Sequence, residues 1–291
     1  MTLDNKNRRR GRLAVFLCAV LWSTAGLFVK LIEWDPLVIA GFRSLIAGLF
    51  MLFVRFLTPG LRLSPFKLRY FWLGGIAYSI TMLLFIAAIK YTTAANAVLL
   101  QYSAPVWAAL LGWLLAKEKP RTVTWISLAM VSGGLCLFFK DGLEGGSFFG
   151  NLLALFSGIS FGANSVFLRI QKKGDQSDTI LTAHAITVLA SIPFLFLHPP
   201  AFTIQNSASI LFLGVVQLGM ASLLFSYGIK RIAAAESMLT ASIEPILNPV
   251  WVLLVIGEKP AMTAIIGGII IIAAVLVSAI KPTFKPTFKP T

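Results

Sequence analysis

Charged residues, cysteines and histidines are all scarce in this sequence. Charged side chains make up 12% of the 291 residues, whereas 57% are hydrophobic, and the mean hydropathy is +0.85. So few charges cannot cover a water-soluble core, which excludes a soluble globular protein and predicts a polytopic membrane protein. Cys18 and Cys136 both fall in apolar stretches, so we expect neither a disulfide framework nor a metal site.

The net charge of +14 does not indicate a nucleic-acid-binding protein, because the basic residues stand at the ends of apolar stretches. Ten stretches are close to the length of about twenty apolar residues that crosses about 30 Å of hydrocarbon. These predicted spans are residues 13–32, 36–57, 69–89, 93–116, 121–139, 148–170, 179–198, 207–229, 235–256 and 261–280.

Lysines and arginines gather in alternate loops of this ten-span arrangement. Roughly twenty lie on the side of the two termini, and about four lie on the other side, namely Lys30, Lys90, Lys140 and Lys259. By the positive-inside rule, both termini are predicted to be cytoplasmic, in a multi-pass protein of the cytoplasmic (inner) membrane.

The second half of the chain repeats the first at an offset of about 140 residues. Leu83-Leu84-Phe85 recurs as Leu223-Leu224-Phe225, and Glu118-Lys119-Pro120 recurs as Glu258-Lys259-Pro260. Five spans are an odd number, so the two halves must point in opposite directions, which is typical of alternating-access transporters. The predicted fold is an all-α membrane protein of ten transmembrane helices in two inverted-topology repeats, residues 13–140 and 148–280.

Two short basic segments lie outside the repeats. Residues 1–12 are predicted to be a basic cytoplasmic N-terminus. Residues 281–291 repeat Lys-Pro-Thr-Phe, and proline at every fourth position excludes a helix there, so we expect a disordered cytoplasmic tail.

Motifs in the fourth and ninth predicted spans carry a family resemblance. Residues 240–245 read Thr-Ala-Ser-Ile-Glu-Pro and lead to Gly257-Glu258, and residues 101–105, Gln-Tyr-Ser-Ala-Pro, are a weaker copy. Together with Arg43, these motifs resemble the EamA-type domains of the drug/metabolite transporter superfamily. The resemblance implies two tandem EamA domains, no cofactor, and a central path lined by the first, third, fourth, sixth, eighth and ninth helices. The family includes exporters of amino acids, purine-like metabolites and organic cations.

A charged side chain at mid-bilayer costs about 2.5 to 3.5 kcal/mol on insertion scales, so each one needs a reason. The candidates for ion coupling or structural charge are Glu244, Arg43, His184 and Glu236. Glu244 would bind an ammonium group or carry a proton, and its alternative role is an ion pair with Arg43 or a hydrogen bond to backbone freed by Pro249. Arg43 would receive a substrate carboxylate or serve structurally. His184 would act in a proton relay or simply pack.

Further polar and aromatic residues are expected at the same depth and complete the predicted substrate-binding set with Glu244. They are Trp22, Ser23, Tyr78, Asn96, Gln101, Tyr102, Asn164, Gln217 and Asn248. Each one alone is better explained as a hydrogen-bonding contact between helices, but their number at mid-depth favours a polar cavity.

These observations favour a secondary transporter of a small amphipathic metabolite, an amino acid or an organic cation, with export as the expected direction. The sequence has no phosphate-binding loop, and every aspartate, Asp178 included, lies in a predicted loop or tail, which argues against ATP and sodium coupling. An intramembrane enzyme would need paired aspartates, a metal site or a buried nucleophile with its base, so none is expected. A lipid or sugar-lipid flippase on the same fold is the alternative. The expected partners are a small solute and membrane lipid, with the chain a monomer or homodimer.

Overall fold

The structure is a computed structural model that describes residues 3–58, 69–116, 122–145, 147–171, 176–229, 231 and 240–280. Its elements are, in chain order, α1 (Leu3–Ser23), α2 (Ala25–Leu31), α3 (Pro36–Phe56), α4 (Arg69–Tyr91), α5 (Ala94–Gln101), α6 (Ala104–Ala116), α7 (Thr122–Gly145), α8 (Phe148–Gln171), α9 (Gln176–Leu197), α10 (Ile204–Leu211), the π-helix η1 (Phe212–Met220), α11 (Ala221–Ile229), α13 (Glu244–Ile256) and α14 (Met262–Ile280). Within these ranges every regular element is a helix.

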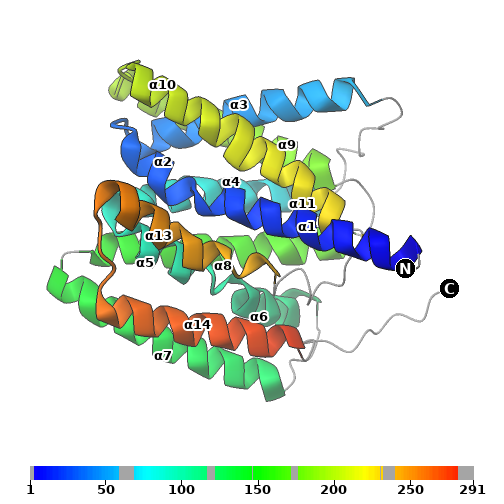
Figure 1. The fold of residues 1–291 in the computed structure, drawn as a ribbon, viewed down its shortest axis with the longest axis vertical. Helices are drawn as coiled ribbons and strands as arrows, with labels where there is room; N and C mark the ends of the chain where they lie inside the picture. The colour runs from blue at the N-terminus through cyan, green and yellow to red at the C-terminus, as the bar shows by residue number, and fades with distance from the viewer. Residues whose placement is uncertain are drawn as a thin grey trace.

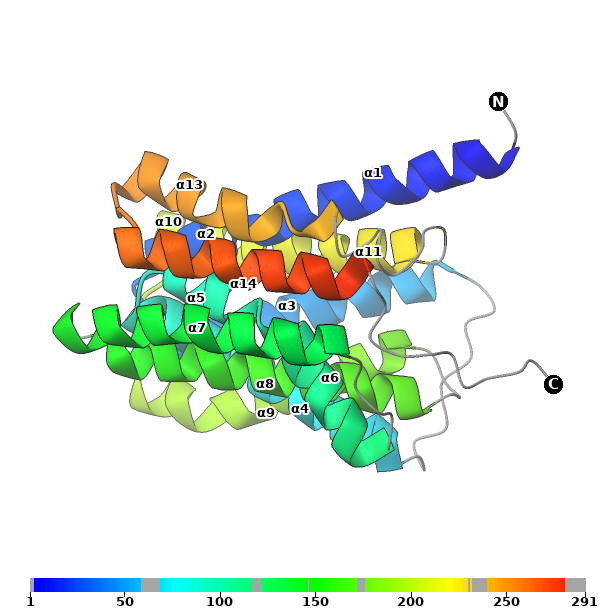
Figure 2. The same ribbon diagram turned by 90° about the horizontal axis from the view of Figure 1, so that it is seen from below.

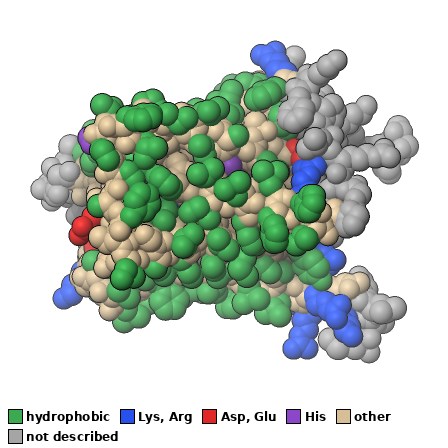
Figure 3. Space-filling view, turned by 90° about the horizontal axis from the view of Figure 1, so that it is seen from above, with side chains coloured by type: hydrophobic (Ala, Val, Ile, Leu, Met, Phe, Trp, Pro, Cys, Tyr) green, Lys and Arg blue, Asp and Glu red, His purple; other side chains and the backbone are tan. Residues whose placement is uncertain are grey.

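The helices form one bundle whose long axes run roughly side by side (Figures 1 and 2). Among the described residues, seven helical stretches are long and apolar enough to cross a membrane, and three shorter apolar helices, Trp125–Leu137, Glu244–Ile256 and Met262–Val277, occupy the remaining predicted spans. Hydrophobic side chains cover the middle of the molecule, and lysines and arginines lie toward its two ends (Figure 3). The protein is an all-α polytopic membrane protein, as predicted.

Contacts between chain segments define the two ends of the bundle. Lys30 forms an ion pair with Glu258, and the end that contains them is called the Lys30 end below. Arg55 forms an ion pair with Asp178 at the opposite end, which is called the Arg55 end. Asp178 was predicted in a loop, but it lies in the first turn of α9 and is 4% exposed, because the helix begins earlier than its apolar stretch.

The two repeats point in opposite directions. The first span, formed by α1 and α2, finishes at the Lys30 end. Thr92 at that same end donates a hydrogen bond (2.8 Å) from Oγ1 to Oδ1 of Asn151 in the first turn of α8, so the sixth span starts where the first one finishes. This geometry confirms the inverted-topology arrangement. Residues 3–12, expected as a separate basic segment, continue α1, while Glu236 and residues 281–291 lie outside the described residues.

The fourth and ninth spans are broken at positions 140 residues apart. A turn at Tyr102 and Ser103 separates α5 from α6, and a turn at residues 242–243 precedes α13. Both second halves contain 13 residues, and each begins one residue before a proline, Pro105 or Pro245. A proline in the middle of a span can bend a continuous helix. Each proline instead occupies the second helical position, where its missing N–H costs no hydrogen bond.

The breaks place two helix N-termini in the interior. Helix α6 runs toward the Arg55 end and α13 runs toward the Lys30 end, and each spans about 18 Å at 1.5 Å per residue. The first span is also interrupted, at Thr24, where the hydroxyls of Ser23 and Thr24 donate to the carbonyls of Val20 (2.7 Å) and Leu21 (2.6 Å). Such bonds compete with helical backbone pairing.

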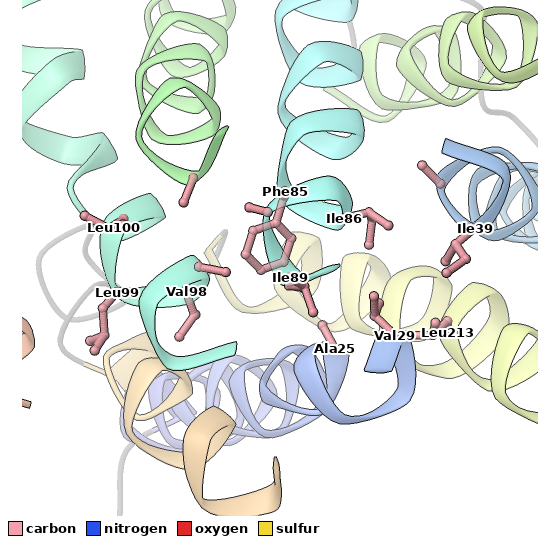
Figure 4. Close-up of a cluster of buried hydrophobic side chains, with 14 of the residues drawn as sticks. Ala25, Val29, Ile39, Phe85, Ile86, Ile89, Val98, Leu99, Leu100 and Leu213 are labelled. Atoms are coloured by element: carbon pink, nitrogen blue, oxygen red, sulfur yellow. The ribbon is translucent and has the colours of Figure 1, made fainter. Parts of the chain in front are cut away.

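A buried hydrophobic cluster lies on the Lys30 side of these breaks (Figure 4). It draws side chains from α2, α3, α4, α5 and η1, and therefore from both repeats. Its labelled members, all at most 7% exposed, are Ala25, Val29, Ile39, Phe85, Ile86, Ile89, Val98, Leu99, Leu100 and Leu213.

Candidate functional site

Arg43 connects the two repeats through an amide and not through a carboxylate. The side chain is 5% exposed, and its Nη2 donates to Oε1 of Gln217 at 2.7 Å. Gln217 in turn donates from Nε2 to the carbonyl of Trp22 at 3.3 Å, just before the break in the first span. No ion pair within 4.0 Å joins Arg43 to Glu244 in the structure, so the structural ion pair considered for these two residues is not formed.

The π-helix η1 carries Gln217. A π-helical turn holds one more residue than an α-helical turn, and such turns are frequent at functional sites. The repeat-equivalent stretch of the first half, residues 72–80, is an ordinary α-helix within α4. The hydrogen bond to Arg43 is therefore carried by a π-helix of the second repeat, and this π-helix has no counterpart in the first repeat.

Glu244 is the first residue of α13, and its side chain is half-buried. Its electrostatic partners are Arg43, Tyr78 and Tyr102, which come from three other spans. Within the described part of the chain, the carboxylate has no hydrogen-bond or ion-pair partner. A negative charge is favoured at a helix N-terminus by about 0.3 to 1 kcal/mol, which helps to hold the carboxylate there. Glu244 is therefore available to a cationic ligand.

Tyr78 and Tyr102 are the aromatic neighbours of this carboxylate, and further aromatic pairs lie on the spans that contribute to the site. Trp22 packs against Phe225, with 5.1 Å between ring centroids, and Tyr78 packs against Phe161 at 6.0 Å. Trp22, Tyr78 and Tyr102 are each half-buried, so none of them is sealed in the core. A ring face attracts a cation, which makes these side chains suitable neighbours for an ammonium group.

Phe161 and Phe225 are site residues that the sequence interpretation missed. A signal for Phe161 was present, because the repeat aligns it with Trp22. Adding the repeat equivalent of Trp22 to the predicted set would have included Phe161, but not Phe225.

Three predicted substrate-binding residues make contacts between helices instead. Ser23 is fully buried and accepts a hydrogen bond from Nε1 of Trp251 at 2.9 Å. Gln101 donates to the hydroxyl of Ser157 at 2.7 Å. Asn96 lies at the Lys30 end, where it donates to Asn151 at 3.1 Å. The structure does not bring these side chains to Glu244.

Three other predicted residues are buried with polar atoms that have no partner in the described chain. Asn248 is 1% exposed with its amide nitrogen and oxygen both unpaired, and Asn164 is 5% exposed with its Oδ1 unpaired. His184 is 1% exposed, neither ring nitrogen is hydrogen-bonded, and Arg43 is its electrostatic neighbour. No group of three potential metal ligands occurs among the residues described.

Comparison with known proteins decides which family these features belong to. A profile of the EamA-like transporter family matches residues 9–140 and again residues 148–280. The chain belongs to the EamA-like transporter family. The resemblance noted in the sequence to the drug/metabolite transporter superfamily is thereby confirmed.

Relatives of this EamA-family chain match it over almost its whole length. An uncharacterized transporter of Archaeoglobus fulgidus is 27% identical over 285 residues, which cover 92% of this chain and 97% of the relative. The uncharacterized transporter YwfM of Bacillus subtilis is 25% identical over 277 residues, which cover 93% and 94% of the two chains. A crystal structure with 19% sequence identity superposes with a TM-score of 0.66 over 94% of this chain and 98% of the other, which supports the fold.

Proposed function

We propose that this EamA-family protein is a secondary transporter that moves a small amphipathic solute carrying an ammonium group, an amino acid or an organic cation, across the cytoplasmic membrane. The observation that carries the proposal is the unpaired Glu244 carboxylate, held in the interior at the break of the ninth span and next to aromatic rings. A carboxylate at this depth needs a counter-charge, and a substrate ammonium supplies one.

The inverted repeats suggest how the solute would cross. The two half-helices α6 and α13 begin in the interior and run to opposite ends, so each repeat contributes one discontinuous helix to the centre. Rocking one repeat against the other would expose this centre to each side in turn. The positive-inside distribution favours a cytoplasmic Arg55 end and an outward-facing Lys30 end.

Only one repeat carries the acid. Ala104 stands at the repeat-equivalent position of Glu244, and it is 5% exposed. The centre therefore has one carboxylate, at the N-terminus of α13. The N-terminus of α6 also faces the interior, but its first residue carries no charge. This asymmetry suits a solute with a positive group at one side and a polar or anionic group at the other.

The flippase alternative finds less support. A groove between α3 and α9 is lined by Val38, Gly41, Phe42, Leu45, Val188, Ser191, Ile192 and Leu195. It presents only apolar surface, and it offers no partner for a lipid headgroup. A lipid acyl chain could lie there without being transported.

Flux measurements test the proposal directly. Purified protein in proteoliposomes should exchange at least one radiolabelled amino acid or quaternary amine above the rate of protein-free liposomes. Glu244→Gln should reduce that exchange at least about tenfold, which corresponds to losing roughly 1.4 kcal/mol of interaction. Exchange of uncharged solutes alone, or full exchange by Glu244→Gln, would contradict the proposal.

Proton coupling is a separate hypothesis that uses the same carboxylate. If Glu244 carries the proton, a pH gradient should drive uptake by the wild-type protein and should have no effect on Glu244→Gln. Driven uptake that is unchanged in this variant would refute the coupling.

A further inference from the structure

An ion pair joins the two repeats at each end of the bundle, Arg55–Asp178 at one end and Lys30–Glu258 at the other. Lys30 in α2 forms the ion pair with Glu258, which follows α13, and its Nζ also donates to the carbonyl of Thr92 at 3.1 Å. The other oxygen of Glu258, Oε1, accepts from the backbone N–H of Ala94 at 2.8 Å. One pair of side chains therefore ties together the end of the first span, the turn between the third and fourth spans, and the end of the ninth span.

The backbone around Glu258 is shaped for this contact. Gly257 has a φ of +80°, the left-handed conformation that favours glycine, and its N–H bonds to the carbonyls of Val252 and Leu253. This cap ends α13 at Ile256 and turns the chain, and Glu258 follows directly after the capping glycine. A second lysine, Lys90, donates to the carbonyl of Ile32 at the same end, which fixes the turn that follows Lys30.

The buried hydrophobic cluster begins next to the pair, since Val29 precedes Lys30, and it brings together side chains of α2, α3, α4, α5 and η1 (Figure 4). About 20 Å of chain in α13 and its cap separates Glu258 from Glu244. Helices of both repeats supply the apolar side chains that lie in this interval. The Lys30 end is thus closed by an apolar layer and by polar contacts between the repeats, among them the Lys30–Glu258 ion pair and the Thr92–Asn151 hydrogen bond.

We propose that the Lys30–Glu258 ion pair is the latch of a gate at the Lys30 end, which is closed in this structure and must open for the central site to reach that side of the membrane. The inference rests on the alternating access proposed above. The two side chains retain 18% and 21% exposure, so water reaches them. Partly exposed pairs contribute little net stability, and a latch of this kind can open and close without a large penalty.

The test measures which face of the membrane reaches the centre, and it needs no substrate. Tyr102→Cys, made in a chain that also carries Cys18→Ala and Cys136→Ser, places a reporter thiol beside Glu244. A membrane-impermeant maleimide is applied to sealed vesicles of each orientation. Lys259→Cys marks the face of the Lys30 end, because Lys259 is exposed at that end.

Removing the latch should shift access toward the Lys30 face. Lys30→Gln and Glu258→Gln should each raise reporter labelling from that face about fivefold and lower it from the opposite face, because an exposed pair is worth up to about 1 kcal/mol. Lys259→Gln removes a lysine at the same end and should change neither rate. Glu118→Gln removes the repeat-equivalent glutamate and should not raise labelling from the Lys30 face.

Two results would overturn the proposal. One is unchanged labelling in both latch variants, and the other is faster labelling from both faces, which indicates general loosening of the fold. A second reporter, Trp22→Cys, repeats the measurement if Tyr102→Cys does not fold. If no ammonium solute is transported but the reciprocal labelling is seen, the proposed substrate is wrong and the gate stands.

Discussion

Gly26 of α2 approaches Asn248 of α13 so closely that a Cβ atom added at Gly26 would stand 2.4 Å from the Asn248 Oδ1 atom. The same Cβ atom would lie 2.9 Å from the Cβ of Ala94 in α5. Gly26 belongs to the first repeat, about one helical turn before Lys30, and Asn248 belongs to the second repeat, nearly three turns before Glu258. The repeats meet here without room for a methyl group.

Gly26→Ala should therefore destabilise the protein. Overpacking of a tight contact costs about 1 to 3 kcal/mol, and the Cβ of Ala94, only 2.9 Å from the added methyl group, is fixed to the backbone and cannot rotate away. The unfolding midpoint in detergent, followed by intrinsic tryptophan fluorescence, is the measurement. Gly133→Ala is the matched control, because a Cβ atom there would meet nothing within 4 Å. Equal midpoints for the two variants would show that the contact is not tight in the protein.

Gln217→Leu should also lower stability, for an electrostatic reason. Leucine leaves the buried Arg43 guanidinium without the 2.7 Å acceptor on Gln217, and an unsatisfied buried group costs about 1 to 3 kcal/mol or more when charged. Flux should fall as well, because Arg43 neighbours Glu244. Gln205→Leu, at an exposed glutamine of the same span, is the control. A stable and active Gln217→Leu variant would contradict this expectation and would show that the Arg43 guanidinium uses another hydrogen-bond acceptor.

Moving the carboxylate to the first repeat should not restore activity. Ala104 is the repeat equivalent of Glu244, but its carbonyl would lie only 2.8 Å from a Cβ atom at Gly162, so α6 and α8 are in close contact at that point. The double variant Ala104→Glu, Glu244→Gln should be less stable than Glu244→Gln alone and equally inactive. Recovery of flux in the double variant would show that the two half-helices are interchangeable.

Most of the fold could be predicted from the sequence, because it depends on properties that composition records. Span length follows from the hydrocarbon thickness, and the opposite direction of the repeats follows from an odd number of spans. The breaks at Tyr102 and at residues 242–243 were not predicted. A proline within an apolar span can either bend a continuous helix or stand at the second position of a new helix, and the sequence does not distinguish these two cases. The π-helix around Gln217 left no recognisable pattern.

The candidate site was predicted less completely, because the depth of a residue in the membrane does not determine the direction in which its side chain points. Successive residues of a helix point about 100° apart, so Trp22 can face the centre while Ser23 packs against Trp251. Asn96 was misplaced for another reason, because the fourth span begins only two residues earlier and the side chain stays at the Lys30 end. Glu244, Tyr78 and Tyr102 do gather, as their shared depth suggested.

Ligand binding to the purified protein tests most directly whether the Glu244 carboxylate receives an ammonium group. Thermal unfolding is measured for the wild type and Glu244→Gln with amino acids, quaternary amines and an uncharged isostere of each compound. At least one ammonium compound at about 100 times its Kd should stabilise the wild type by about 2.7 kcal/mol, whereas its isostere should not. Glu244→Gln should show neither effect. Equal stabilisation of the wild type and Glu244→Gln by every active compound would contradict the claim.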